Sequence, residues 1–324
     1  MINDILVSVV APIYNEEECI KEYIEQTTFI LKKNYLNYEL ILVDDGSYDN
    51  TTKIIQQILK EIKNIRLILL SRNYGREIAI TAGLDSAIGD YVVVMDSDLQ
   101  DSPSFIPKLI GKAVKGFDVV YAARTNRKGE SFLKKTFSKI FYKIASNMSG
   151  FTIPENAGDF RVFNRKVVNS IGQLKETNRY MKMLYAYVGF KVSYIKFERD
   201  SRHAGKTKYN YSQLFDASLD AIVNFSNKPL RLLSLFSVSI SFILFVFGIF
   251  ITVNKLIYAN NIAEGWTSTM VFISLMFSIL FTFLAIISEY ISRILVESKN
   301  RPLYYIREEI NSSNILNKNI ADDL

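Results

Sequence analysis

Cysteine and histidine are almost absent from this sequence, which has one of each in 324 residues. Cys19 has no second cysteine with which to form a disulfide within the chain, and it brings no metal-ligand set with it. Because His203 is the sole histidine, the sequence argues against a zinc site and against a serine–histidine–aspartate triad.

Glycine-rich phosphate loops are also missing. No G-x-G-x-x-G follows the first predicted strand, and no G-x-x-x-x-G-K-[ST] occurs in the sequence, which argues against a dinucleotide-binding dehydrogenase and a P-loop NTPase. The net charge of +6 is modest, and its lysines lie near the predicted membrane contacts rather than in a nucleic-acid motif. We therefore expect no nucleic-acid partner.

Two uncharged apolar runs are present, residues 232–253 and 267–288, each 22 residues long. As a helix, each would extend about 33 Å, against a bilayer hydrocarbon core of about 30 Å. A buried soluble helix is the alternative, but two full-length runs joined by the polar segment 254–264 favour a transmembrane hairpin. Gly248 and several serines would let helices approach closely, so a homo-oligomer is one option for the assembly.

The distribution of basic residues predicts which side of the membrane each end occupies. The segment between the runs has only Lys255, whereas basic residues flank the outer ends of both runs: Lys228, Arg231, Arg293, Lys299 and Arg301. This asymmetry favours both ends in the cytoplasm. The first residues lack the basic flank and apolar core of a signal peptide, so we expect a cytoplasmic N-terminal part on the inner (plasma) membrane.

The N-terminal two thirds alternates apolar strands with helices. Strands are predicted at 5–11, 38–43, 65–70, 91–95 and 118–122, with helices between them ending near residues 33, 63, 88 and 114. Such alternation is typical of an α/β fold with a doubly wound parallel sheet.

Carboxylates follow three of these strands at the end where ligands bind in open α/β sheets. Asp96 and Asp98, with the amide of Gln100, offer hard oxygen ligands that suit Mg²⁺ or Mn²⁺. For an isolated D-x-D the alternative is capping of the next helix. Asp44 and Asp45 could accept hydrogen bonds from a nucleoside, or could instead stabilise the turn before Gly46.

Four motifs at this spacing resemble the family 2 glycosyltransferases of the GT-A fold: Pro12-x-Tyr14-Asn15-Glu16, Val43-Asp44-Asp45-Gly46-Ser47, Arg72-Asn73-x-Gly75 and Met95-Asp96-Ser97-Asp98-Leu99-Gln100-Asp101. The motifs Asn156-Ala157-Gly158-Asp159-Phe160-Arg161 and Arg202-His203-Ala204-Gly205-Lys206-Thr207-Lys208-Tyr209 are similar to the polyprenyl-phosphate branch, which includes dolichyl-phosphate mannose synthases and bactoprenol glucosyltransferases. The resemblance covers residues 5 to 293.

The resemblance implies roles for the acids and their neighbours. A nucleoside would lie against Pro12, Tyr14, Glu16 and Asp44. Asp96 and Asp98 would face ribose and metal, and Gln100 would complete the metal's protein ligands. Arg76 departs from the usual family pattern, and it either contacts the base or is solvated.

The resemblance also implies roles for four basic side chains and one acidic side chain. Arg202 and Lys208 would close over the donor phosphates, unless they form a basic stretch attracted to anionic lipid. Arg124 and Arg127 would hold the acceptor phosphate, unless they belong to a solvated loop. Asp159 is the candidate catalytic base, although a lipid phosphate is already anionic near neutral pH and needs mainly to be oriented.

Residues 132–144 place apolar side chains on one helical face and lysines on the other, which predicts an interfacial helix or, alternatively, one that faces the core. The predicted layout begins with a Rossmann-like GT-A domain over 1–208, in which the resemblance implies a mostly parallel sheet. A juxtamembrane amphipathic helix over 209–229, two spans within 230–292 and a cytoplasmic tail over 293–324 follow.

Together these features predict an inverting, metal-dependent enzyme that transfers one sugar from a nucleotide sugar, UDP-glucose or another UDP-hexose, to polyprenyl (undecaprenyl) phosphate. A processive polysaccharide synthase is the nearest alternative, but the Q-x-x-R-W motif is missing because Trp266 is the sole tryptophan. A non-catalytic membrane scaffold that senses nucleotide sugars is an alternative from another class.

Overall fold

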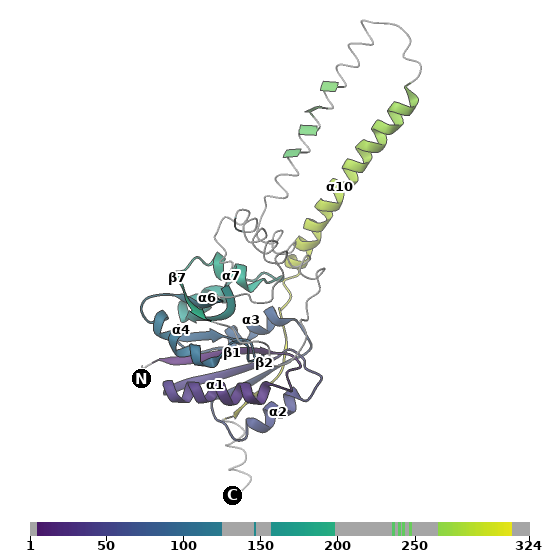
Figure 1. Ribbon diagram of the computed structural model, residues 1–324. Helices are drawn as coiled ribbons and strands as arrows, with labels where there is room; N and C mark the ends of the chain where they lie inside the picture. The colour runs from purple at the N-terminus through teal and green to yellow at the C-terminus, as the bar shows by residue number, and fades with distance from the viewer. Residues whose placement is uncertain are drawn as a thin grey trace. The chain divides into compact units, whose positions relative to one another are not determined.

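The computed structural model describes residues 5–124, 146, 157–197 and 265–312, and eight positions between 235 and 247. The chain divides into two compact units (Figure 1). The first comprises Met1–Ala221 and Pro302–Leu324, and the second comprises Ile222–Arg301.

An eight-stranded sheet with the order β7-β5-β6-β4-β1-β2-β3-β8 forms the centre of the first unit (Figure 1). Four of its seven pairings are parallel: β1 with β2 and β4, β2 with β3, and β5 with β7. The strands are β1 Leu6–Ile13, β2 Asn37–Asp44, β3 Ile65–Leu70, β4 Tyr91–Val94, β5 Val119–Arg124, β6 Ala157–Asn164, β7 Val192–Phe197 and β8 Ile306–Asn311.

The five predicted strands are confirmed, and most of the strand pairings are parallel, as predicted for a GT-A sheet. β6 lies between β4 and β5 and runs antiparallel to both, and β8 runs antiparallel to β3. Strands pair through backbone hydrogen bonds, which do not depend on an apolar sequence. The apolar pattern therefore did not reveal that β6 lies between β4 and β5 or that β8 pairs with β3.

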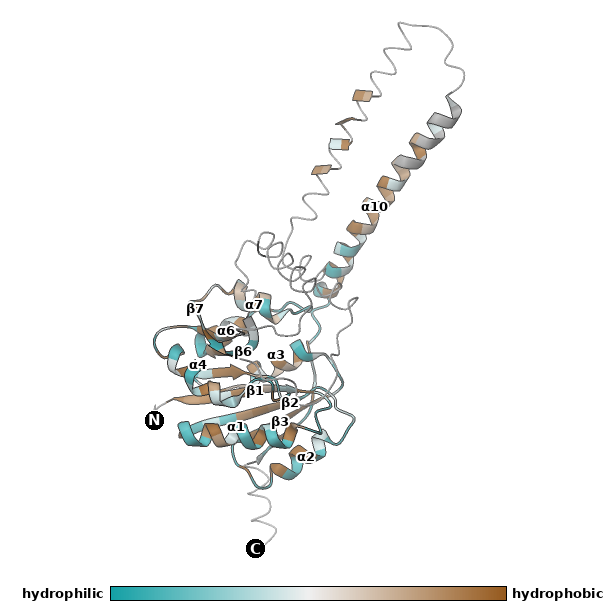
Figure 2. Ribbon diagram, viewed as in Figure 1, coloured by the Kyte–Doolittle hydropathy of each residue, from teal (hydrophilic) through white to brown (hydrophobic). Residues whose placement is uncertain are grey.

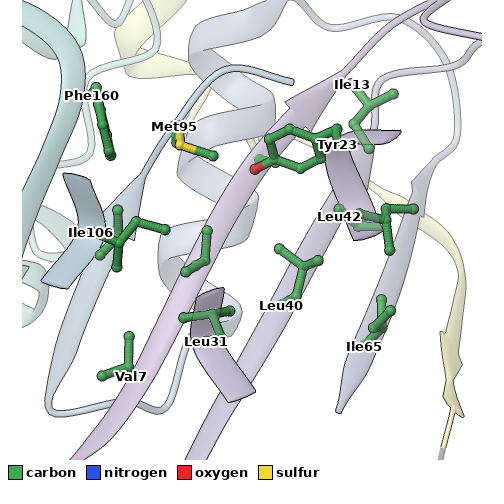
Figure 3. Packing of buried hydrophobic residues seen from close by; sticks show 14 of the residues in the cluster. Val7, Ile13, Tyr23, Leu31, Leu40, Leu42, Ile65, Met95, Ile106 and Phe160 are labelled. Atoms are coloured by element: carbon green, nitrogen blue, oxygen red, sulfur yellow. The ribbon is translucent and has the colours of Figure 1, made fainter. Parts of the chain in front are cut away.

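Helices cover both faces of the sheet. Tyr23 and Leu31 of α1 pack with the strand residues Leu40 and Leu42 in a buried cluster (Figure 3). On the other face, α3 approaches so closely that a Cβ on Gly83 would lie 2.2 Å from Val10. The helices are α1 Ile20–Asn34, α2 Thr51–Ile58, α3 Arg76–Ser86, the 3₁₀ turn η1 Pro103–Phe105, α4 Ile106–Ala113, α6 Arg165–Gly172 and α7 Met181–Tyr187.

The chain after the second unit returns to the sheet, which the sequence did not predict. Residues 306–311, placed in a tail by the sequence analysis, form β8 on the edge of β3. Arg66 of β3 is held between Glu39, at 3.0 Å, and Glu309 of β8, at 2.7 Å. Tyr304 also donates from its hydroxyl to Oδ2 of Asp85 at 3.0 Å. The first unit is therefore built from two separate stretches of the sequence.

The second unit contains α10, Trp266–Ser298, which at 1.5 Å per residue is about 50 Å long. Within the described residues, Met276–Ser298 is the one stretch found long and apolar enough to cross a membrane. The predicted span 267–288 lies inside α10, and the helix continues through Glu289 and Arg293, an ion pair at 2.7 Å. Figure 2 shows that hydrophobic residues dominate the helix and that hydrophilic ones occur toward its C-terminal end.

The predicted first span, 232–253, is described at eight positions only, and all eight are helical. Two aromatic pairs connect it to α10: Phe236 with Phe283, at a centroid distance of 6.2 Å, and Phe247 with Phe272, at 6.0 Å. From the first pair to the second, the residue number rises by eleven in the segment 236–247 and falls by eleven in α10. These contacts are those of two antiparallel segments.

Candidate active site

The loops after β1 and β2 are joined by hydrogen bonds. The backbone N–H of Asn15 donates to Oγ of Ser47 at 3.0 Å, and Oδ1 of Asn15 accepts from the N–H of Tyr48 at 3.0 Å. The N–H of Glu16 donates to Oγ1 of Thr51 at 2.9 Å. The predicted nucleoside residues of the first loop therefore lie beside the loop that carries Asp44.

Two tyrosine rings stand at this edge of the sheet. Tyr14 and Tyr48 pack edge to face, with centroids 6.2 Å apart, and Tyr48 is largely exposed. Pro12 lies in β1 next to Val43 of β2, and its carbonyl oxygen accepts from Oγ of Ser97 at 3.2 Å. An exposed aromatic surface of this kind can stack on a nucleobase.

Asp44 uses both of its oxygens within the protein. Oδ1 accepts from the N–H of Ser47 at 2.8 Å, and Oδ2 accepts from Oγ1 of Thr52 at 2.5 Å. The residue is 2% exposed. These contacts are the ones expected if Asp44 stabilises the turn before Gly46. A hydrogen bond between Asp44 and a nucleoside stays a prediction.

Asp45 fixes the loop that leads into α3. Its Oδ1 and Oδ2 accept from the backbone N–H groups of Tyr74 and Gly75, at 2.7 and 2.8 Å. Burial raises the pKa of the Asp45 carboxyl, although these two N–H groups favour its charged form. Gly46 allows the loops to touch, because its φ is +77° and a Cβ there would lie 2.8 Å from the nitrogen of Asn73.

Gly46→Ala is therefore expected to lower the free energy of unfolding by about 2–4 kcal/mol, from left-handed backbone strain plus the backbone clash. Gly111→Ala is the matched control, since Gly111 lies in α4 with no heavy atom within 4 Å of the added Cβ. That change should stabilise the protein by up to about 1 kcal/mol. Denaturant titrations would measure both, and equal effects would contradict the role given to Gly46.

The sheet register brings Asp96 and Asp159 together. β6 is antiparallel to β4 with Val94 opposite Arg161, so Asp159 within β6 lies level with Asp96, two residues beyond the end of β4. Nε and Nη2 of Arg76 donate to Oδ1 of Asp96, at 3.0 and 2.5 Å. Nη2 also lies 3.2 Å from Oδ2 of Asp159. Arg76 thus joins two predicted site acids that are far apart in the sequence.

Two further charged residues complete this cluster. Nζ of Lys182 lies 3.7 Å from Oδ2 of Asp159, and Oε1 of Glu77 lies 3.5 Å from Nη1 of Arg76. Oε2 of Glu77 accepts from the N–H of Met181 at 3.0 Å, which ties α3 to α7. Burial lowers the pKa of Arg76, but Asp96, Asp159 and Glu77 more than offset this and raise it well above its usual value.

The loop after β4 has the donor atoms that a hard cation prefers. Asp96 and Asp98 are half-buried carboxylates, and Gln100 adds an amide oxygen from the same loop. Asp96 uses Oδ1 for Arg76, and Oδ1 of Asp98 accepts from the N–H of Gln100 at 3.1 Å. The donor chemistry fits Mg²⁺ or Mn²⁺, although the described residues contain no cluster of three acidic, histidine or cysteine ligands.

Cys19 lies beside this loop, with Sγ 3.2 Å from Oε2 of Glu16 and 3.5 Å from the carbonyl oxygen of Ser97. Burial, reinforced by the Glu16 carboxylate, raises the pKa of the thiol to about 12. At pH 8 the thiolate, which is the reactive form, is then roughly a thousandfold scarcer than for an ordinary cysteine. We expect a thiol reagent to label native protein at least that much more slowly than urea-unfolded protein, and similar rates would contradict the environment described for Cys19.

Several predicted residues cannot be compared with the structure. Arg124 ends β5, but its side chain lies outside the described part of the chain. Further predictions also fall outside the described residues: Arg127, Arg202, Lys208 and the helices at 132–144 and 209–229. Lys182 and Glu77 were not predicted as site residues. Glu77 adjoins Arg76 at the start of α3, which was a usable signal, whereas Lys182 reaches the site through folding alone.

Comparison with known proteins agrees with the motif analysis. The profile of glycosyl transferase family 2 matches residues 8–172. "Uncharacterized glycosyltransferase YkcC" of Bacillus subtilis (strain 168) is 41% identical over 317 residues, which cover 98% of this chain and 97% of that protein. "Bactoprenol glucosyl transferase" of Shigella phage SfV is 35% identical over 303 residues, which cover 94% of this chain and 98% of that protein.

Among solved structures, a glucosyl-3-phosphoglycerate synthase from Mycobacterium tuberculosis aligns with 20% identity and a TM-score of 0.47, over 68% of this chain and 79% of that chain. That likeness is too weak to bear on function.

Proposed function

Because the chain belongs to glycosyl transferase family 2 and is a glycosyltransferase, we propose that it transfers a single sugar from a nucleotide sugar to a polyprenyl phosphate. Relatives that match over most of their length are named bactoprenol glucosyl transferases, which supports a polyprenyl-phosphate acceptor and a glucosyl group as the sugar transferred. As donor we propose UDP-glucose or another UDP-hexose. The observation that carries the proposal is the cluster in which Arg76 links Asp96 with Asp159.

In this proposal, the reaction is a direct displacement. An oxygen of the lipid phosphate forms a bond to the anomeric carbon while the bond to the donor diphosphate breaks, so the nucleoside diphosphate leaves and the configuration inverts. A divalent cation held by Asp96, Asp98 and Gln100 would supply positive charge to the leaving diphosphate. Tyr14 and Glu16, with Pro12 beneath them, would hold the nucleoside.

Asp159 is proposed as a positioning residue for the acceptor side. A phosphate monoester has a second pKa of about 6, so its attacking oxygen is already anionic near neutral pH and needs no strong base. Arg76 and Lys182 both lie near the same oxygen of Asp159, and this arrangement suits a carboxylate that is held in place. Two further contacts remain predictions from the sequence: binding of the acceptor phosphate by Arg124 and Arg127, and binding of the donor phosphates by Arg202 and Lys208.

We further propose that the protein is a multi-pass protein of the plasma membrane with its catalytic domain in the cytoplasm. The chain enters the unit 222–301 from the sheet domain and returns to the same sheet through β8. If α10 crosses a membrane, the chain before it has to cross as well, because otherwise the two ends would lie on opposite sides. The antiparallel aromatic pairs between residues 236–247 and α10 support a second span.

The reaction is tested with full-length protein in detergent, undecaprenyl phosphate and a panel of UDP- and GDP-sugars. Release of nucleoside diphosphate that depends on the lipid and on one donor, and that EDTA abolishes, is the expected result, with Asp98→Ala as the inactive control. If no donor turns over although one binds and protects the protein against unfolding, the enzyme proposal fails and the sensor alternative replaces it.

The topology is tested by cysteine labelling in intact cells, because the buried native Cys19 should stay unlabelled. We expect a membrane-impermeant thiol reagent to label Asn260→Cys from outside, since residue 260 lies in the segment between the two runs. Lys299→Cys, just after α10, should be labelled only after permeabilisation. The reverse pattern, or equal labelling of the two sites, would contradict a cytoplasmic catalytic domain.

A further inference from the structure

Arg76 is hydrogen-bonded to Asp96, the carboxylate proposed as a ligand of the divalent cation. Two of its nitrogens donate to one oxygen of Asp96, and such charge-assisted pairs are the strong class of hydrogen bond. The side chains of Arg76 and Asp96 are 29% and 24% exposed, so a ligand from solution can reach them. No other cation of the described residues pairs with Asp96.

We propose that Arg76 competes with the divalent cation for Asp96, so that the cation binds well only in company with the nucleotide. This inference rests on the proposed function, which places Asp96 among the metal ligands. Its physical basis is that the guanidinium occupies Oδ1 of Asp96 and offsets the charge of the whole carboxylate. Without the nucleotide, a cation that binds either oxygen therefore meets a positive charge held beside it, unless it displaces the arginine from its two hydrogen bonds.

The nucleotide changes this balance because it brings a new anion. Arg76 is held from its other side by Asp159, at 3.2 Å, and by Glu77, at 3.5 Å. A guanidinium released from Asp96 therefore stays in the site, where the donor diphosphate offers oxygen acceptors that replace the lost carboxylate. Arginine and cation then no longer need the same partner. The arrangement favours joint binding of metal and nucleotide over binding of metal alone.

The test measures Mn²⁺ binding to the full-length protein in detergent by isothermal titration calorimetry, with and without UDP. Without UDP, Arg76→Gln should bind Mn²⁺ roughly tenfold more tightly than the wild type, the size expected when charge-assisted hydrogen bonds no longer oppose binding. With UDP present, this gain should disappear. Arg76→Lys, which keeps the charge but loses the fork of nitrogens, should give a smaller change of the same sign.

Lys182→Gln is the matched control, since it removes one positive charge from the same cluster without touching Asp96. Equal tightening in Arg76→Gln and Lys182→Gln would overturn the proposal, because the effect would then be a general one of charge. Unchanged or weaker Mn²⁺ binding in Arg76→Gln would also overturn it. If the wild type binds no Mn²⁺ even with UDP, the metal dependence in the proposed function fails, and this inference fails with it.

Discussion

Asp96→Asn is expected to lower kcat by about 10²–10³-fold, the loss typical when a group that stabilises transition-state charge is removed. Asp96 lies two residues after the end of β4, and it is both the partner of Arg76 and a proposed ligand of the cation. The amide keeps the shape of the side chain and removes its charge. Because the residue is partly exposed, the unfolding temperature should change little.

Asp90→Asn is the matched control for that variant. Asp90 stands at the opposite end of β4, where its Oδ2 accepts from the N–H of Leu6 at 2.8 Å. We expect its kcat to stay within a factor of two of the wild type, as roughly holds for surface changes away from special features. An Asp96→Asn protein that kept most of its turnover under saturating substrates would contradict the role given to the β4 edge.

A chain that stops after Arg301 should keep a folded first unit of markedly lower stability. It would lack β8, which pairs with β3 at five registered positions, and it would leave Arg66 without Glu309. At about 1 kcal/mol for each lost backbone pairing, the loss is about 5 kcal/mol. For a domain of this size the unfolding temperature would fall by about 10–20 °C. Thermal unfolding in detergent measures this directly.

The control for the truncation is a chain that stops after Ser312. It keeps β8 and the hydroxyl that accepts from the N–H of Ile65 at 3.2 Å. A protein stopped after Arg301 that unfolds at the same temperature as this control would show that β8 adds nothing to the stability of the sheet.

The central strands could be predicted because they are buried on both faces. Most residues of a strand buried on both faces are apolar, so β4 reads as a continuous apolar run and β1 as an apolar run interrupted only by Ser8, which is hydrogen-bonded to Glu39. β7 and β8 could not be found in this way. They are edge strands whose side chains are largely exposed, and β8, with the sequence IREEIN, is mostly polar.

Asp44, Asp96 and Asp98 could be predicted because they lie at or just after the ends of apolar strands, and Asp159 was named from its motif. The partners of these acids could not be predicted. The register between β4 and β6 decides that Asp96 meets Asp159, and that register depends on an antiparallel pairing that no local pattern encodes. Lys182 reaches Asp159 because Glu77 and Met181 join α3 to α7. The motifs therefore predicted which residues form the site, and the fold decides which of them touch.

The position of β8 in the chain also sets an order of assembly. During synthesis, β3 is made before α10, and β8 follows only after α10. Until then the backbone N–H and C=O groups on the outer edge of β3 have no strand to pair with, and an open edge of this kind invites association with other chains. The sheet can be completed only after α10 has been made, so a chain whose synthesis stops within α10 carries an enzyme domain that lacks its last strand.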